Sequence, residues 1–450
     1  MTPKNVFARA AVTVALAFAC LAPAWAALPI QKWQQPSGAQ VWLVESPSLP
    51  IIDVEIDFDA GARRDPAEKA GLAGVTASMA GKGVEARNGQ PALDENQLGE
   101  AWADLGAGFG GSASLDRMSF TLRSLTYPEL LQKAVQLAAR ELGEPAFPDT
   151  VWQRDRQRMI AAIREANTRP GTIAGRAFQQ AVYGGHPYGF EATEETLNRI
   201  GVQDMRDFYR TMQPCRAKVS VVGAVTRAQA DAIVTTLLSR LPNGSCQRLP
   251  SVAEVPALPA SAERNVPFAS AQAHVLIGQP GYRRDDPDYF PLLVGNYILG
   301  GGGFVSRLNE EVRQKRGLSY SIYSYFAPGL HAGAFTLGLQ TRPDQAVQAV
   351  QVSRDVVRRF VAEGPTAAEL KAAKDFMIGG FALRLDSNRK LLDNLANIAW
   401  YDLPLDYLDT WTKQVEKVTA ADVKAAFARK LQPDRMVTVV VGGDVAAARQ

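Results

Sequence analysis

The chain repeats a long stretch of its own sequence, and this repeat constrains the fold more than any other feature. Residues 54–66 recur as residues 275–287, and residues 208–223 recur as residues 427–442. Both pairs are separated by about 220 of the 450 residues. Two matches at nearly the same offset indicate two duplicated domains of similar topology.

Each half shows the same succession of hydrophobic patterns. Strand-like patterns lie at 54–58, 119–123 and 219–222 in the first half and at 273–277, 334–340 and 437–441 in the second. Helical spacing of apolar residues lies at 127–142 and 149–165, and at 343–363 and 366–385. This order predicts an α+β fold of two homologous domains, each a mixed and mostly antiparallel sheet packed with helices.

Composition suggests the domain boundaries. Residues 1–26 have a basic start, a short apolar stretch and the ending Ala-Trp-Ala, which predicts a signal peptide cleaved after Ala26. A lipoprotein site at Cys20 is the alternative, but the residues before Cys20 fit that pattern poorly. We expect an exported, periplasmic protein. Its predicted parts are a first domain at 27–248, a Pro-rich linker at 249–267 and a second domain at 268–450.

Neither the net charge nor the cysteine content indicates a particular ligand. Loss of Lys4 and Arg9 with the signal peptide lowers the net charge from +3 to +1, and no basic tract predicts nucleic acid binding. The remaining cysteines, Cys215 and Cys246, either pair or stay as two free structural thiols, because sequence does not supply disulfide geometry. A cysteine zinc site is disfavoured because the chain has no Cys-x-x-Cys spacing.

The predicted helix Gly71-Leu-Ala-Gly-Val-Thr-Ala-Ser-Met79 resembles the signature helix of the pitrilysin/insulinase-type peptidases, the inverzincins. In that family His-x-x-Glu-His supplies two zinc ligands and a general base. The resemblance puts Gly74 and Ser78 at the histidine positions and Ala77 at the glutamate position. None of these residues can bind zinc or act as the base, so the resemblance implies a degenerate motif and no metal on this chain.

The family's third ligand is a glutamate on a later helix, which the resemblance places at residues 154–165. Alanines stand where the family usually has two glutamates, and Glu165 is a possible but lone carboxylate. The three histidines, His186, His274 and His331, are scattered. His186 lies in a loop tetrapeptide, and the other two lie in strand-like contexts, so we expect scaffold roles for all three.

The segment from Leu299 to Ser321 resembles the motif of the same family's C-terminal domain. It begins with Gly300, Gly301, Gly302 and Gly303, and no Lys-Ser or Lys-Thr follows at the spacing of a phosphate-binding loop. The resemblance places the substrate-contacting pair on Arg313 and Tyr320 and implies that the glycines let backbone approach substrate or flex.

The chemistry of this pair is plausible without the resemblance. A guanidinium holds a carboxylate or carbonyl, and a phenol donates to a developing oxyanion. The alternative is structural: Arg313 forms a salt bridge with Glu310 or Asp285, and Tyr320 is a half-buried strand residue.

The resemblance covers nearly the whole chain after the signal peptide and is most similar to the mitochondrial-processing-peptidase type. It implies a non-catalytic, substrate-binding subunit of a heterodimeric zinc metallopeptidase that acts on peptides. The zinc would belong to a homologous catalytic partner with an intact His-x-x-Glu-His motif. An edge strand of the first domain would bind peptide by strand addition. The alternatives are a scaffold or peptide-binding protein without catalytic involvement and, less favoured, an independently active zinc endopeptidase.

Overall fold

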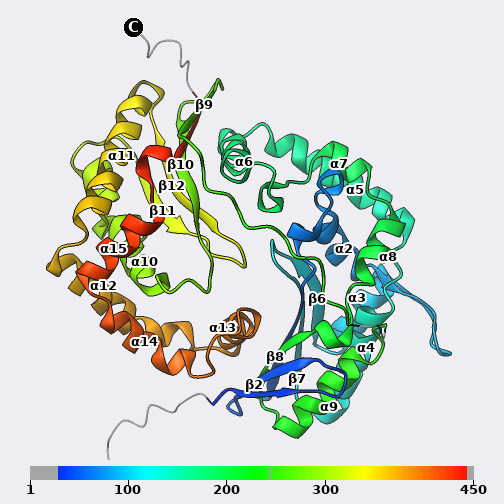
Figure 1. The fold of residues 1–450 in the computed structure, drawn as a ribbon. Coiled ribbons are helices and arrows are strands. Elements are labelled where there is room, and N and C mark those ends of the chain that lie inside the picture. Colours follow the sequence, from blue (N-terminus) through cyan, green and yellow to red (C-terminus); the bar gives the residue numbers. More distant parts are fainter. Residues whose placement is uncertain (1–28, 243, 245, 443–450) are drawn as a thin grey trace, which may run out of the picture.

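The computed structural model describes residues 29–242, 244 and 246–442, which form two halves that each contain one large sheet. The predicted signal peptide, with Cys20 and Ala26, lies outside the described residues. The sheets of the two halves lie on either side of the centre of the molecule, and most helices cover their outer faces (Figure 1). This arrangement confirms the predicted α+β fold of two related domains.

The first sheet has the strand order β1-β2-β8-β3-β7-β6 and the second has the order β11-β12-β10-β13-β9. The strands of the first sheet are β1 (Gln31–Gln34), β2 (Gln40–Glu45), β3 (Ile51–Phe58), β6 (Gly108–Ala113), β7 (Met118–Leu125) and β8 (Lys218–Gly223). Those of the second are β9 (Ala262–Val266), β10 (Ala273–Tyr282), β11 (Ser321–Phe326), β12 (Gly333–Thr341) and β13 (Val437–Val441). The short strands β4 (Gly83–Val84) and β5 (Leu93–Asp94) pair separately.

The helices of the first half are α2 (Leu72–Ala80), α3 (Glu95–Asp104), α4 (Pro128–Gly143), α5 (Asp149–Ala166), α6 (Pro170–Tyr183), α7 (Glu194–Asn198), α8 (Val202–Tyr209) and α9 (Arg227–Leu238). Those of the second half are α10 (Tyr289–Asn296), α11 (Ala346–Glu363), α12 (Ala367–Gly379), α13 (Asn388–Trp400), α14 (Tyr407–Lys417) and α15 (Ala420–Lys430). Within the ranges that the structure describes, no helix combines the length and apolar character of a membrane span.

The two sheets share one topology. The order β6-β7-β3-β8-β2 in the first corresponds to β11-β12-β10-β13-β9 in the second. The directions agree as well, because β2 pairs with β8 and β9 pairs with β13 in parallel, whereas the other neighbours are antiparallel. The repeat seen in the sequence is therefore a repeat of structure.

Each strand divides its side chains between two faces of the sheet. In β3 the apolar residues Ile52, Val54 and Ile56 are buried in the core under the outer helices, as strand alternation requires. The intervening Asp53, Glu55 and Asp57 lie on the opposite face. We call this opposite face of each sheet its inner face.

The halves exchange one helix each. Helix α6 of the first half packs on β10 and β13 of the second sheet, where Phe178 joins a core with Val437 and Val439. Helix α13 of the second half packs on β3 and β8, where Leu395 joins a core with Trp42. Both helices lie between the two sheets in Figure 1. Each inner face is therefore covered in part by the other half.

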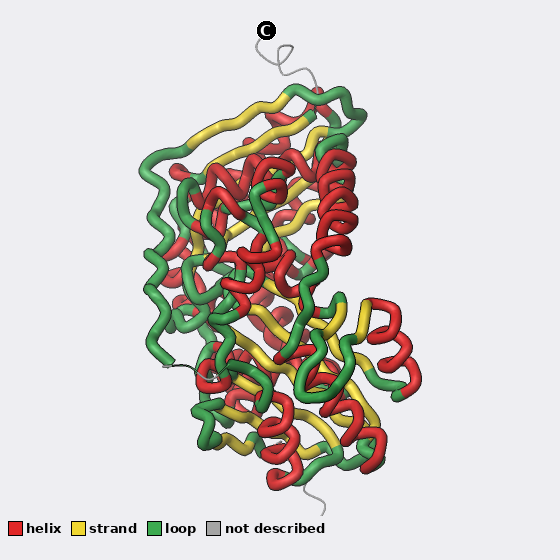
Figure 2. The backbone as a smooth tube through the Cα atoms, turned by 90° about the vertical axis from the view of Figure 1, so that its right-hand side faces the viewer, coloured by secondary structure: helices red, strands yellow, loops and turns green. Residues whose placement is uncertain are grey.

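The predicted linker at 249–267 does more than connect the halves. It runs as an extended segment along one side of the molecule and ends in β9 at the edge of the second sheet (Figure 2). Val255 of this segment is buried in the same core as Phe178. Its prolines fit the extended path, but its last part supplies a strand that the sequence did not reveal.

A buried polar junction also joins the halves. Asp116 of the first half accepts hydrogen bonds from the Tyr188 hydroxyl (2.6 Å) and from the backbone N–H of Leu330 in the second half (2.9 Å). The Tyr188 oxygen in turn accepts from the backbone N–H of His331 at 3.1 Å. Arg63 lies 3.1 Å from Asp116 and supplies the counter-charge. Because Asp116 and Tyr188 are buried, these contacts position the two halves at a defined angle.

The histidines lie in scaffold positions. His186 accepts from the backbone N–H of Tyr188 through Nδ1 (3.1 Å), and its Nε2 contacts the Ala253 carbonyl oxygen (2.9 Å). His274 lies in β10 as expected. His331 lies in a bend before β12 rather than in a strand, and its ring packs against that of His186 with centroids 5.3 Å apart.

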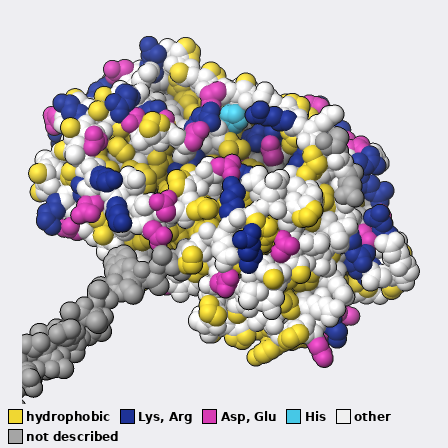
Figure 3. Space-filling model, turned by 60° about the horizontal axis from the view of Figure 1, so that its bottom comes forward, with side chains coloured by type: hydrophobic (Ala, Val, Ile, Leu, Met, Phe, Trp, Pro, Cys, Tyr) yellow, Lys and Arg dark blue, Asp and Glu magenta, His cyan; other side chains and the backbone are white. Residues whose placement is uncertain are grey.

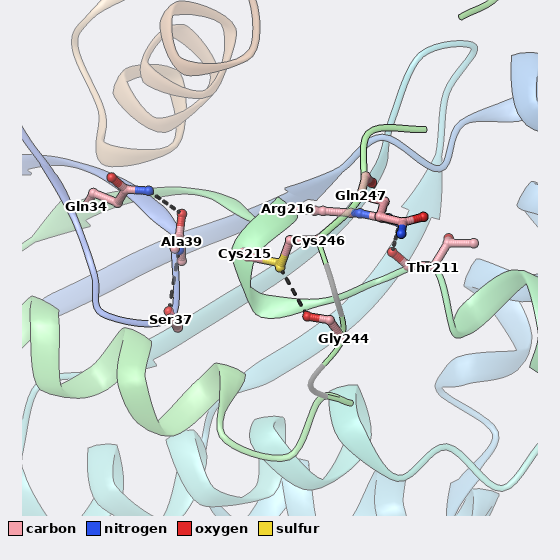
Figure 4. The surroundings of a disulfide bond; sticks show 10 residues. Gln34, Ser37, Ala39, Thr211, Cys215, Arg216, Gly244, Cys246 and Gln247 are labelled. Atoms are coloured by element: carbon pink, nitrogen blue, oxygen red, sulfur yellow. Dashed lines mark hydrogen bonds between the residues drawn. A yellow bond between two sulfur atoms is a disulfide. The ribbon is translucent and has the colours of Figure 1, made fainter. Parts of the chain in front are cut away.

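Cys215 and Cys246 form a disulfide (Figure 4). Cys215 belongs to the short turn before β8, and Cys246 belongs to the segment that follows α9. The Arg216 guanidinium donates to the Gln247 carbonyl oxygen at 2.6 Å, beside the disulfide. The bond therefore ties the start of the linker region to the first sheet.

Candidate functional site

Helix α2, which carries the degenerate zinc motif, packs on β6 and begins at a cap formed by Asp65. The Asp65 carboxylate accepts from the backbone N–H groups of Gly71 (2.8 Å) and Ala73 (2.9 Å), which have no partners within the helix. Burial raises the pKa of Asp65 to about 6. This cap fixes where the helix starts and so fixes which of its residues face outward.

Gly74 and Ser78 lie one helical turn apart on the exposed side of α2, whereas Ala77 is buried. A Cβ atom at Gly74 would meet open space. Side chains at these two positions would share one face of the helix and could reach one ion. Glycine has no side chain, however, and serine offers only a neutral hydroxyl. These residues do not fit zinc, which needs histidine, cysteine or carboxylate ligands.

The carboxylates beyond the end of α2 are held in ion pairs. Lys82 contacts Glu95 at 2.7 Å and Asp155 at 3.9 Å, and Arg154 contacts the same two residues, each at 2.8 Å. Hydrogen bonds from Lys82 and Arg154 lower the pKa of Glu95, and that from Arg154 lowers the pKa of Asp155. Over residues 29–242, 244 and 246–442, no group of three histidine, cysteine or acidic side chains is arranged to hold a metal.

Glu165, the lone carboxylate of the predicted third-ligand helix, lies at the end of α5. Its side chain is exposed and pairs with Arg169 one turn further on. This contact lowers the pKa of Glu165. Glu165 is thus a solvent-facing member of a surface ion pair.

Strand β6 is the outermost strand on one side of the first sheet, beside α2. Its inner-face positions are Gly108, Gly110 and Ser112, and Cβ atoms at the two glycines would meet open space. The equivalent strand of the second half, β11, is different. There the Ser324 carbonyl oxygen accepts from the Asn296 amide at 3.0 Å, which covers the middle of the strand edge.

The second predicted site, Arg313 and Tyr320, forms a stack on the surface. The Arg313 guanidinium lies 5.0 Å from the centroid of the Tyr320 ring and 4.6 Å from that of Phe304. Tyr320 is 80% exposed. Glu310 pairs with Lys315 and Asp285 pairs with Arg283. The exposure of Tyr320 differs from that of the half-buried strand residue in the structural alternative. The partly buried Arg313 guanidinium therefore lies against two aromatic rings.

The glycine run before this stack serves close packing. A Cβ atom at Gly300 would lie 2.3 Å from the Ser324 hydroxyl, and one at Gly302 would lie 2.7 Å from the Tyr297 carbonyl oxygen. Gly303 has a φ of +59°, which favours glycine, and turns the chain toward Phe304. These glycines bring the loop against β11 and present Phe304 beside Arg313.

The sequence motif indicated Arg313 and Tyr320 as candidates, but it did not indicate Phe304 or the ion pairs beyond α2. On the face in Figure 3, Lys, Arg, Asp and Glu side chains are scattered among hydrophobic and other side chains.

Comparison with known proteins places this geometry in a family. Residues 199–377 match the family description "Peptidase M16 inactive domain". A crystal structure of the peptidase M16 inactive domain from Pseudomonas fluorescens is 32% identical with a TM-score of 0.86, and the match covers 93% of this chain and 98% of that chain. The chain belongs to the peptidase M16 family. This confirms the predicted family resemblance.

Two curated M16 relatives carry different descriptions. The chain is 27% identical to "Non-peptidase homolog YmxG" of Helicobacter pylori, over 75% of this chain and 83% of that protein. It is 23% identical to "Uncharacterized zinc protease YmxG" of Bacillus subtilis, over 82% of this chain and 88% of that protein. With Gly74, Ala77 and Ser78 at the motif positions, this M16 chain lacks the two zinc-binding histidines and the general base of the His-x-x-Glu-His motif.

Proposed function

We propose that this M16 chain is the exported, periplasmic, substrate-binding subunit of a heterodimeric zinc metallopeptidase. The observation that carries the proposal is the stack of the partly buried Arg313 with the exposed Tyr320, on a chain whose zinc-motif positions hold no ligand. Among the described residues no carboxylate forms a salt bridge with Arg313, and such a cation and phenol suit contacts to a peptide carbonyl or carboxylate. The homologous partner would supply zinc, base and water.

Strand β6 supports a role in holding the peptide. It ends the sheet, and the described residues place no further strand beside its outer edge. An extended peptide that adds to such an edge is bound by backbone hydrogen bonds and is selected through side-chain pockets. The small residues Gly108, Gly110 and Ser112 leave space for the peptide's side chains on the inner face.

Reconstitution tests the proposal. The chain is purified without its predicted signal peptide and mixed with a homologue that has an intact His-x-x-Glu-His motif, and hydrolysis of a quenched fluorescent peptide is followed. We expect no activity and no stoichiometric zinc for the chain alone, and activity on mixing. Tyr320→Phe should lower turnover about a hundredfold without changing complex formation, because it removes a donor to the developing oxyanion.

The rival functions give different results in the same assay. A scaffold or peptide-binding protein without catalytic involvement predicts that Arg313→Gln and Tyr320→Phe leave the partner's turnover unchanged. An independently active zinc endopeptidase predicts stoichiometric zinc and hydrolysis by the chain alone. Val305→Ala is the matched control, since Val305 is exposed beside Phe304 and offers no polar group.

A further inference from the structure

A cavity of about 340 Å³ lies between α6 and the inner face of the second sheet. One wall is α6, with Gly171, Gly175 and Phe178, and the other consists of β10, β11 and β12. A Cβ atom at Gly175 would meet nothing within 4 Å, so this glycine borders empty space. The volume is within the range of ligand sites, about 300–1,000 Å³. We call this space the aromatic cavity.

Two tyrosines of β11 make one wall of the cavity aromatic. Tyr323 and Tyr325 occupy alternate positions and are 43% and 45% exposed, and their rings stack with centroids 6.0 Å apart. The Tyr323 ring lies over Gly338 of β12, where a Cβ atom would come within 2.5 Å of it. Two stacked rings beside an empty space present an aromatic surface for a further ring.

Among the described residues, those that line the cavity include no aspartate, glutamate, lysine or arginine. Its histidine, His274, has a pKa lowered by burial. The cavity at the equivalent place in the first half, between α13 and the strands β3, β6 and β7, has a volume of about 680 Å³ and is lined by charged residues that include Glu55, Arg117 and Arg389. Because the halves are duplicated, the uncharged aromatic lining belongs to the second half and not to the fold in general.

We propose that the aromatic cavity binds the uncharged aromatic side chain of a peptide. That the ligand is a peptide rests on the proposed function. The substrate class is peptides that carry phenylalanine, tyrosine or tryptophan. The ring would pack between Tyr323 and Phe178, and Gln340 and Ser321 offer hydrogen bonds at the rim. Ser321 directly follows Tyr320, so the cavity adjoins the Arg313–Tyr320 pair along the chain.

Ligand binding to the chain alone tests the proposal without a partner. The probes are the N-acetyl amides of phenylalanine, tyrosine, leucine and arginine, observed by saturation-transfer NMR with the purified chain. We expect saturation transfer to the two aromatic probes and at least tenfold less to the leucine and arginine probes. Gly175→Leu, which fills the cavity from inside a helix that tolerates leucine better than glycine, should abolish the aromatic signal.

Two further variants control for folding and for surface binding. Gly99→Leu makes the same change at an open helical position in α3, outside the cavity, and should bind like the wild type. Tyr323→Ser removes the opposite wall at an exposed position and should weaken the aromatic signal at least fivefold. Unchanged binding in both Gly175→Leu and Tyr323→Ser, or equal binding of the arginine probe, overturns the proposal.

This outcome is separable from that of the proposed function. Aromatic binding that Gly175→Leu abolishes, together with no effect of the chain on partner turnover, would refute the peptidase subunit and keep the aromatic site. Normal reconstituted turnover with no aromatic binding would keep the subunit and refute the site.

Discussion

The Arg313 guanidinium lies 5.0 Å from the centroid of the exposed Tyr320 ring and 4.6 Å from that of Phe304. Both rings attract the cation, which keeps its charge. The stack therefore orients the Arg313 guanidinium, which would otherwise sample many positions. We expect this orientation to favour a contact to peptide more than it raises the stability of the fold.

The first prediction concerns Phe304. Phe304→Ala removes one wall of the stack, and an exposed cation–π contact contributes about 0.5–1 kcal/mol, so peptide turnover of the reconstituted complex should fall about two- to fivefold. The melting temperature should fall by no more than about 2 °C, because Phe304 is 66% exposed and so small a loss shifts the melting of a large chain only slightly. Steady-state kinetics and a thermal melt check both statements. Val305→Ala is the control, and an equal loss in that variant would contradict a specific role for the ring.

The second prediction concerns Glu141, which is buried and accepts a hydrogen bond from the Trp102 indole at 2.8 Å. Burial raises its pKa to about 7 from an ordinary value of 4.5. As pH rises from 4.5 to 7, the unfolded chain releases this proton before the folded chain does. The contribution of Glu141 to the free energy of unfolding therefore falls through this window and stays low above it.

Glu141→Gln should thus stabilise the protein by ~2 kcal/mol at pH 8 and change little near pH 4. The amide oxygen of glutamine still accepts from Trp102. Urea denaturation at both pH values measures the effect, and Glu129→Gln on the exposed side of the same helix is the control. A destabilised Glu141→Gln at pH 8 would refute the assignment.

The third prediction concerns the disulfide between Cys215 and Cys246, which are 31 residues apart in sequence. Closing a loop of this length restricts the unfolded chain, so replacing both cysteines by serine should lower the free energy of unfolding by ~3 kcal/mol. Dithiothreitol should bring the wild type to the stability of the double variant and leave that variant unchanged. An equal change in the free energy of unfolding of both proteins on adding dithiothreitol would argue against the disulfide.

The fourth prediction uses the empty geometry of α2. Gly74 and Ser78 are exposed one turn apart, so histidines at both positions would reach one ion without a clash at residue 74. Gly74→His/Ser78→His should bind Zn²⁺ at least about tenfold more tightly than Gly74→His alone, because two ligands act together. Isothermal titration calorimetry measures both. Equal affinities would show that the two positions do not converge.

Much of the fold was predictable because the apolar residues of its most regular strands and helices recur at the spacing typical of those elements. The predicted strand 219–222 lies within β8, 437–441 is β13, and 149–165 is nearly all of α5. Strand β6 was missed because Gly108, Gly110 and Gly111 carry none of the β-branched or aromatic side chains that mark a strand. Strand β9 was taken for linker because prolines precede it.

The candidate site was predictable only where residues are neighbours in a motif. The Arg313–Tyr320 pair follows from a local resemblance, but the contact of Arg313 with Phe304 depends on how the loop turns at Gly303. The exchange of α6 and α13 was not predictable either. An amphipathic pattern shows that a helix buries one face, and it does not show which sheet receives that face.

That exchange has a consequence for what one repeat could do alone. A single repeat would lack the helix that covers the inner face of its sheet, whereas two copies supply that helix to each other, as in a domain-swapped homodimer. In a chain that carries both copies, this encounter is an intramolecular event with a high effective concentration. The two copies need not be identical, so one cavity can be charged while the other is aromatic.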